Sequence, residues 1–289
     1  MSMLLVRYKM LKASDSKVMS ILMLYLFFPC VIIYSFQVDF TEQVKQGLLL
    51  GTGAAVIIHA LFLFICKLLE KFLGMNPVEK CSVIYTNSGN LMIPLVTAVL
   101  GPEWVIYTSS FLMVQLVLFW THLKSEMAGE PQMEWKAVIT NFNMIAIMIG
   151  FVLLLTGIRL PAQVNDAIGS LGSMVGATAM IIAGMLLGEI DFKKLTTFKG
   201  LPLVVAFRLI IVPLISLALL KYSGMAGFVE NGDMILLITL MACSTPSATT
   251  VVSMASLFGE DGEYASAINV ATSILCIFTM PVIVALYQW

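Results

Sequence analysis

Nine long apolar segments constrain this chain more than any other feature. They lie at residues 20–36, 46–66, 82–100, 104–123, 138–157, 167–188, 201–220, 234–257 and 264–287. Each has roughly 17–25 residues, the length that a helix needs to cross the hydrocarbon core of a bilayer. Arg208 is the one formal charge inside them. The pattern predicts an all-α polytopic membrane protein with nine spans.

The composition points to the same surroundings. Hydrophobic residues make up 60% of the 289, and charged residues 11%, against about 45–50% and 25% in soluble domains. An excess of this size needs an apolar solvent, so we expect the lipid bilayer as a partner. The net charge of −1 argues against nucleic acid as a partner, because nucleic-acid-binding proteins carry an excess of basic residues. The five cysteines show no metal-ligand spacing, so we expect neither a metal nor a cofactor.

Basic residues between the spans predict the orientation, because Lys and Arg collect in cytoplasmic loops. One side carries 12 of them, at 7, 9, 12, 17, 67, 71, 80, 124, 136, 193, 194 and 199. The other side carries 3, at 45, 159 and 221. The N-terminus is therefore predicted inside and the C-terminus outside.

Two of the spans are interrupted by polar residues, glycine and proline. Residues 85–94 read YTNSGNLMIP, and residues 242–250 read ACSTPSATT. Proline removes a helical hydrogen bond and clashes with the preceding turn. In lipid, such a break is tolerated only where protein or a water-filled cavity surrounds it. We therefore expect two broken helices around a site, with plain kinks as the alternative.

The two breaks occupy corresponding places. Each is followed by a turn with glycine and acidic residues, LGPEW at 100–104 and FGEDGE at 258–263, and then by a full span. Under the predicted orientation the two broken spans run in opposite directions. This predicts an inverted-repeat transporter fold, with residues 1–123 as the first repeat, 124–137 as a cytoplasmic loop and 138–289 as the second repeat. Matching interruptions in two halves are typical of secondary transporters, whose substrate binds near the midplane.

The broken helices suggest an anionic substrate. Their internal N-termini present free N–H groups and positive dipole ends, which suit a carboxylate. The predicted substrate-binding residues are those at the breaks: Asn87, Ser88, Gly89, Asn90, Pro94, Thr245, Pro246, Ser247 and Thr249.

Two ionisable residues inside the spans have alternative roles. Arg208 could neutralise a substrate carboxylate, extend to the membrane interface or bind carbonyls at helix ends, and a structural role is favoured. His59 could carry a coupling proton, but a hydrogen-bonded structural histidine is favoured.

The motif NSGNLMIP (87–94) resembles the Asn-x-Gly-Asn…Pro signature of the auxin efflux carrier family, which includes bacterial malate permease-like proteins. The resemblance continues at RLIIVP (208–213), TPSATTVVSMASLFG (245–259) and EYASAINVATS (263–273). It implies ten helices in two inverted five-helix repeats, with the stretch 87–94 crossing the stretch 245–248. It also implies transport of small organic anions, either auxin-type monocarboxylates or dicarboxylates such as malate, across the bacterial cytoplasmic membrane.

The chain departs from that pattern in two places. Nine spans are counted where the family would have ten, and MSMLLVRYKM resembles the tail of the first helix. Either the true start lies upstream or the chain is naturally short. Asn141-Phe142-Asn143 stands where Asn-Pro is usual, and either asparagine is expected to cap the following helix.

Three function classes remain. A secondary carrier of organic anions is favoured, and a symporter of the bile acid:sodium type is the alternative that sodium dependence would reveal. A membrane enzyme would need a nucleophile–base pair or metal ligands inside the spans, and we predict that the chain is not an enzyme. Span 167–188 carries small residues on one face, which predicts close packing in the scaffold, with a homodimer contact as the alternative.

Overall fold

The computed structural model describes residues 2–188 and 197–289, and helices make up nearly all of this part. The chain divides into two compact units. Unit 1 comprises Met1–Thr41, Gly89–Ser109 and Ile139–Phe192, and unit 2 comprises Glu42–Ser88, Ser110–Val138 and Lys193–Trp289. Lys193 and Lys194, which the orientation argument counts, lie outside the described residues.

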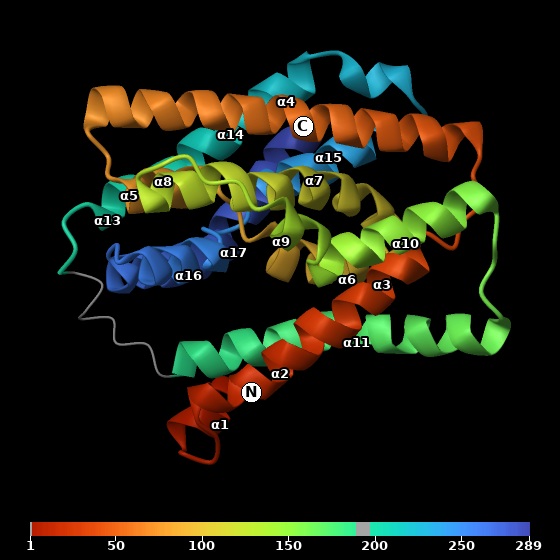
Figure 1. Cartoon of the computed structure of the whole chain (residues 1–289), viewed down its shortest axis with the longest axis horizontal. Coiled ribbons are helices and arrows are strands. Elements are labelled where there is room, and N and C mark those ends of the chain that lie inside the picture. The colour runs from red at the N-terminus through yellow and green to blue at the C-terminus, as the bar shows by residue number, and fades with distance from the viewer. Residues whose placement is uncertain (1, 189–196) are drawn as a thin grey trace. The chain divides into compact units, whose positions relative to one another are not determined.

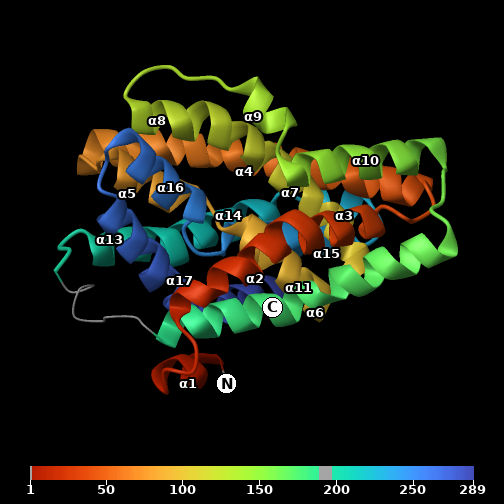
Figure 2. The same ribbon diagram turned by 60° about the horizontal axis from the view of Figure 1, so that its bottom comes forward.

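Unit 1 is built around its longest helix. Its elements are α1 (Ser2–Arg7), η1 (Ala13–Asp15), α2 (Ser16–Leu22), η2 (Met23–Phe27), α3 (Phe28–Ser35), most of η3 (Ser88–Met92), α6 (Ile93–Val99), η4 (Pro102–Trp104), α10 (Phe142–Thr156) and α11 (Ala162–Gly188). The helix α11 packs against α1, α3 and α6, and α10 packs against α3 (Figure 2). The side chain of Asn141 caps α10, as predicted, by accepting from the N–H groups of Asn143 and Met144.

The small residues of α11 are used inside unit 1. A side chain at Gly172 would meet Val31 of α3 at 3.0 Å, and one at Gly169 would meet the ring of Tyr34. A Cβ added at Gly176 would lie 3.8 Å from the carbonyl oxygen of Pro94 in α6, which is an ordinary contact, whereas the approaches at Gly172 and Gly169 are closer. Such close approaches require the absence of a Cβ atom, so this face serves packing of the scaffold.

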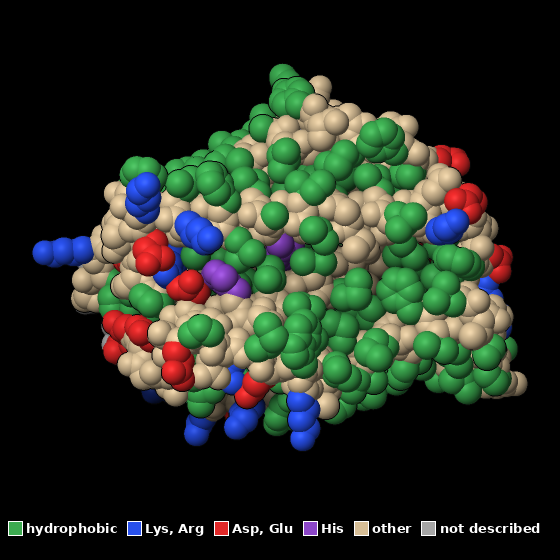
Figure 3. All heavy atoms as spheres, turned by 45° about the horizontal axis from the view of Figure 1, so that its top comes forward, with side chains coloured by type: hydrophobic (Ala, Val, Ile, Leu, Met, Phe, Trp, Pro, Cys, Tyr) green, Lys and Arg blue, Asp and Glu red, His purple; other side chains and the backbone are tan. Residues whose placement is uncertain are grey.

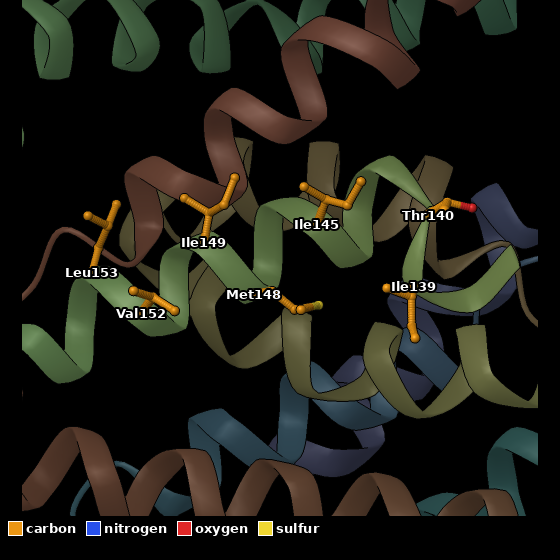
Figure 4. Close-up of a pocket in the computed structure, with 7 residues that line it drawn as sticks. All are labelled: Ile139, Thr140, Ile145, Met148, Ile149, Val152 and Leu153. Carbon is orange, nitrogen blue, oxygen red and sulfur yellow. The ribbon is translucent and has the colours of Figure 1, made fainter. Parts of the chain in front are cut away.

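The outer face of α10 is apolar. It forms a shallow hollow that contains none of the predicted site residues (Figure 4). The lining residues are Ile139, Thr140, Ile145, Met148, Ile149, Val152 and Leu153. Ile145, Met148, Ile149 and Val152 are all exposed there. A helix face of this composition suits contact with hydrocarbon.

Unit 2 contains the remaining helices. They are α4 (Glu42–Leu73), α5 (Pro77–Ile84), the larger part of α7 (Val105–Leu118), η5 (Phe119–Leu123), α8 (Lys124–Ala128), most of α9 (Trp135–Ile139), α13 (Leu201–Ala206), η6 (Phe207–Ile211), α14 (Val212–Tyr222), η7 (Met225–Phe228), α15 (Gly232–Cys243), α16 (Thr249–Phe258) and α17 (Gly262–Gln288). In its core α15 packs against α4, α14 and α17, and α16 packs against α17 and α8 (Figure 1).

Both predicted breaks are found, whereas the count of nine spans stays a prediction. Five helical segments are long and apolar enough to cross a membrane: Ser16–Ser35, Glu42–Leu73, Pro102–Ala128, Leu201–Tyr222 and Gly262–Gln288. Shorter apolar helices occupy Ser88–Val99, Phe142–Thr156, Gly232–Cys243 and Thr249–Phe258. The predicted span 234–257 is indeed interrupted between Cys243 and Thr249, and the span 82–100 between Ile84 and Ser88.

Prolines explain most of the widened helical turns. Three five-residue π-helical turns each end two residues before a proline: Met23–Phe27 before Pro29, Ser88–Met92 before Pro94, and Phe207–Ile211 before Pro213. A proline has no N–H for the carbonyl four residues earlier, and its ring clashes with that carbonyl. The chain accommodates the clash with one extra residue in the turn, a device that is frequent at functional sites.

Candidate functional site

The two helix breaks are bonded to each other within unit 2. Thr86 and Ser247 face one another in an isolated antiparallel bridge. The N–H of Asn87 donates to the carbonyl of Pro246 at 2.8 Å, and the N–H of Ala248 donates to the carbonyl of Tyr85 at 3.0 Å. Each extended stretch therefore satisfies backbone groups that the other leaves open where its helix stops.

A glutamine of α7 holds the outer edge of the first break. In such a bridge the N–H and C=O of the facing residues point away from the partner strand. Oε1 of Gln115 accepts from the N–H of Thr86 at 3.2 Å and from its hydroxyl at 2.7 Å. Nε2 of Gln115 donates to the carbonyl of Thr86 at 2.9 Å and to Oγ of Ser88 at 2.8 Å. One amide thus serves four groups of the break.

Two residues of α17 do the same for the second break. The N–H of Ser247 donates to Oγ1 of Thr272 at 3.1 Å, and Nδ2 of Asn269 donates to the carbonyl of Ser247 at 2.6 Å. Each break is therefore held by the full helix that follows it in the chain. Sequence reasoning missed these three residues. A signal was present, because Gln115 and Asn269 are the single amide side chains of the predicted spans 104–123 and 264–287.

Arg208 lies behind the two breaks and is fully buried, at 0% exposure. Its Nε donates to the carbonyl of Thr245 at 3.0 Å, its Nη1 donates to the carbonyl of Val83 at 2.7 Å, and its Nη2 donates to the carbonyl of Cys243. Val83 and Cys243 belong to the last turns of α5 and α15, where carbonyls lack helical partners and the dipole is negative. These contacts are those expected if Arg208 binds helix-end carbonyls, and the buried side chain does not reach the surface of the structure.

The charge of Arg208 has no acidic partner in the part of the chain that the structure describes. Its hydrogen bonds go to neutral carbonyls, and none of the ion pairs of these residues includes it. The π-helical turn η6 carries this arginine one turn before Pro213. A positive charge therefore stands next to the breaks without a carboxylate to balance it.

His59 has the contacts of a structural residue. Its Nδ1 lies 2.7 Å from the carbonyl of Ala55, one turn earlier in α4. Its ring packs against the rings of Phe111 and Phe62, with centroids 4.5 Å and 5.8 Å away. These contacts match the hydrogen-bonded role that was favoured for it.

The predicted site residues fall into two groups. The first group lies in unit 2, at the breaks or at the first residue of α16, and comprises Asn87, Ser88, Thr245, Pro246, Ser247 and Thr249. Ser88 and Ser247 are buried, and the hydroxyl of Ser247 has no hydrogen-bond partner among the described residues. Gly89, Asn90 and Pro94 belong to unit 1, where they lie on η3 and α6.

The groups at the breaks are of kinds that can bind an anion. Two helical segments begin there, η3 at Ser88 and α16 at Thr249, and the first N–H groups of a helix favour negative charge. Neutral amides and hydroxyls and the charge of Arg208 add to this preference. Among residues 2–188 and 197–289, no group of three His, Cys, Asp or Glu side chains converges as a metal site.

Comparison with known proteins places the chain in a family. The profile of a family described as membrane transport protein matches residues 3–136 and 131–284, which together span nearly the whole chain. No curated protein matches it. The chain therefore belongs to the membrane transport protein family of the auxin efflux carriers, and it is an integral membrane transporter rather than an enzyme.

Proposed function

We propose that this protein is a secondary carrier of small organic anions, of the mono- or dicarboxylate class. The substrate binds at the paired helix breaks and is exposed to the two sides of the membrane in turn.

One observation carries the choice of an anion, namely the buried guanidinium of Arg208 with carbonyls as its partners. A carboxylate about 8 Å from this charge would gain about 2 kcal/mol at an effective dielectric constant of about 20. A cationic substrate would lose a similar amount. The charge of Arg208 thus acts on the substrate from behind the backbone of the breaks, without direct contact.

The residues of the breaks supply the neutral ligands. The amides of Asn87 and Asn90 and the hydroxyls of Ser88, Ser247 and Thr249 are the donors for a carboxylate. Ser247 is the most direct of them, because its buried hydroxyl has no partner among the described residues. Gly89, Pro94, Thr245 and Pro246 shape the backbone that presents these groups.

The inverted-repeat fold is part of the proposal. The bridge between Thr86 and Ser247 is antiparallel, so the two broken stretches run in opposite directions. Gln115 binds the backbone of the first break, and Asn269 and Thr272 bind the backbone of the second break in the same way. This correspondence supports two repeats within 1–123 and 138–289. The nine spans, the N-terminus inside and the C-terminus outside complete the proposal and rest on the sequence pattern alone.

Unit 2 suits the moving part of an alternating-access carrier. It holds the bridge, both stretches up to Ser88 and Ala248, and the three side chains that fix them. A body so bonded can move without losing the backbone hydrogen bonds of the breaks. The small-residue packing of α11 against α3 and α6 gives unit 1 the close contacts of a scaffold.

Electrophysiology on a solid-supported membrane tests this function. Proteoliposomes are exposed to a panel of mono- and dicarboxylates, with matched amides as neutral controls. A saturable current with the acids alone supports the proposal. Loss of that current when sodium is replaced by choline would favour the bile acid:sodium symporter type instead. An equal response to the amides would contradict an anion carrier.

A further inference from the structure

A chain of polar side chains leads from the end of η5 to the first break. The hydroxyl of Tyr85 lies 2.9 Å from Nδ1 of His122. On the other side of the ring, Nε2 of His122 lies 3.6 Å from Oε1 of Glu126. Tyr85 directly precedes Thr86 in the bridge, and its carbonyl accepts from Ala248. The imidazole is therefore two contacts away from the second break.

A cluster of acidic and basic side chains lies beside this histidine. Nζ of Lys80 pairs with Glu126 at 2.5 Å and with Glu70 at 2.6 Å. Lys67 of α4 also acts on the ring, as do Lys80 and Glu126. The helix α16, which packs on η5, carries no titratable side chain. Glu126 pairs with Lys80 through Oε2 and faces Nε2 of His122 with Oε1, so a proton on this nitrogen places a positive charge beside a carboxylate.

The proton has access to the ring. The side chains of His122 and Glu126 are 24% and 26% exposed, and a histidine at the surface beside acidic and basic side chains is visible in Figure 3. Tyr85, by contrast, is 1% exposed. The pair thus joins a solvent-accessible imidazole to a buried phenol at the break.

Protonation reverses the hydrogen bond between these two residues. A neutral ring with its hydrogen on Nε2 accepts at Nδ1 from the hydroxyl of Tyr85. A protonated ring donates from both nitrogens, so the Tyr85 oxygen must accept. The hydroxyl hydrogen then turns to the carbonyl of Leu118, whose oxygen lies 3.4 Å from the hydroxyl oxygen of Tyr85.

We infer that His122 is a proton-binding site that controls the first break through Tyr85 and thereby sets the pH dependence of transport. The inference rests on the proposed function for its last step. The proton enters at the surface beside Glu126, and its effect reaches the bridge as a reversed hydrogen bond on the residue before Thr86. His59 of α4 packs against the rings of Phe62 and Phe111 and does not belong to this series of polar contacts.

Nuclear magnetic resonance tests the proton site without any transport. The full chain contains two histidines, so ¹⁵N-histidine labelling in lipid nanodiscs gives two imidazoles, and His122→Gln assigns them. We expect the His122 ring to titrate, with its hydrogen on Nε2 when neutral. Tyr85→Phe should move the midpoint by about half a pH unit or more, whereas Tyr107→Phe in α7 should leave it in place.

Transport assays then test whether protonation of His122 changes the rate of transport. With a carboxylate that stays ionised from pH 5 to 8, the wild-type rate should change about threefold or more across the His122 midpoint. His122→Gln should transport at a rate that no longer follows this midpoint. A ring that keeps one protonation state across the tested pH range, or a midpoint unchanged by Tyr85→Phe, overturns the site. A His122→Gln variant with the wild-type pH profile overturns its role in transport.

Discussion

The N–H of Asn87 donates to the carbonyl of Pro246 at 2.8 Å, which joins two residues that each follow a stopped helix. With the reciprocal bond between Ala248 and Tyr85, it makes one bridge from two interruptions. A polar break at membrane depth is stable only if its backbone groups find partners in protein or water. Here the breaks partner each other through two backbone hydrogen bonds, and side chains of α7 and α17 hold their remaining groups.

Gln115→Ala should destabilise the protein strongly. The substitution leaves the N–H, the carbonyl and the hydroxyl of Thr86, together with Oγ of Ser88, without their partner. Unmet buried groups cost about 1–3 kcal/mol each, so for four groups we expect a total loss of about 4 kcal/mol or more. Thermal unfolding in detergent measures it. The matched control is Gln46→Ala on the exposed face of α4, and an equal effect of the two variants would contradict this account of Gln115.

Thr272→Val should destabilise less, because it keeps the shape of the side chain and removes one acceptor. The N–H of Ser247 loses its bond at 3.1 Å, at a cost of about 1–2 kcal/mol. The Tm and the rate of transport should both fall. A Tm equal to that of the wild type would show that the second break does not depend on this hydroxyl.

Two substitutions at Arg208 separate the effect of its positive charge from the effect of its three hydrogen bonds. Arg208→Lys keeps the positive charge but cannot reach three carbonyls at once, so the Tm should fall while selectivity for anions remains. Arg208→Met removes the charge as well, and the saturable anion current should disappear. The Tm of both variants shows whether they fold. A folded Arg208→Met that transports carboxylates with the wild-type KM would show that this charge does not act on the substrate.

Asn90→Ala tests the first broken helix as a source of ligands. Asn90 is half-buried on η3, so the Tm should change little, while saturable transport is lost. The comparison variant is Asn269→Ala, which should lower the Tm because Asn269 supports the backbone of Ser247. Normal transport by Asn90→Ala would remove this residue from the site.

Much of this arrangement could be predicted from the residues, and the limits have physical reasons. Pro94, Pro246 and Gly89 predict interruptions because their effect on a helix is local. The matching of Thr86 with Ser247 is a long-range register, which no local pattern specifies. Gln115 and Asn269 were overlooked because one amide in an apolar span has no periodicity to mark its purpose. For Arg208 the sequence left three roles open, and the positions of Val83, Cys243 and Thr245 were needed to choose among them.

The central claim is that the paired breaks bind the anion, and Ser247→Ala tests it most directly. The hydroxyl of Ser247 is buried and has no partner among the described residues, so its removal should leave the Tm unchanged. A hydrogen bond to a charged group contributes about 1.5–3 kcal/mol, and its loss should raise the KM for the transported carboxylate about tenfold or more. The measurement is the concentration dependence of the current in proteoliposomes. A tenfold rise in KM at unchanged Tm is the predicted result, and an unchanged KM would contradict the account.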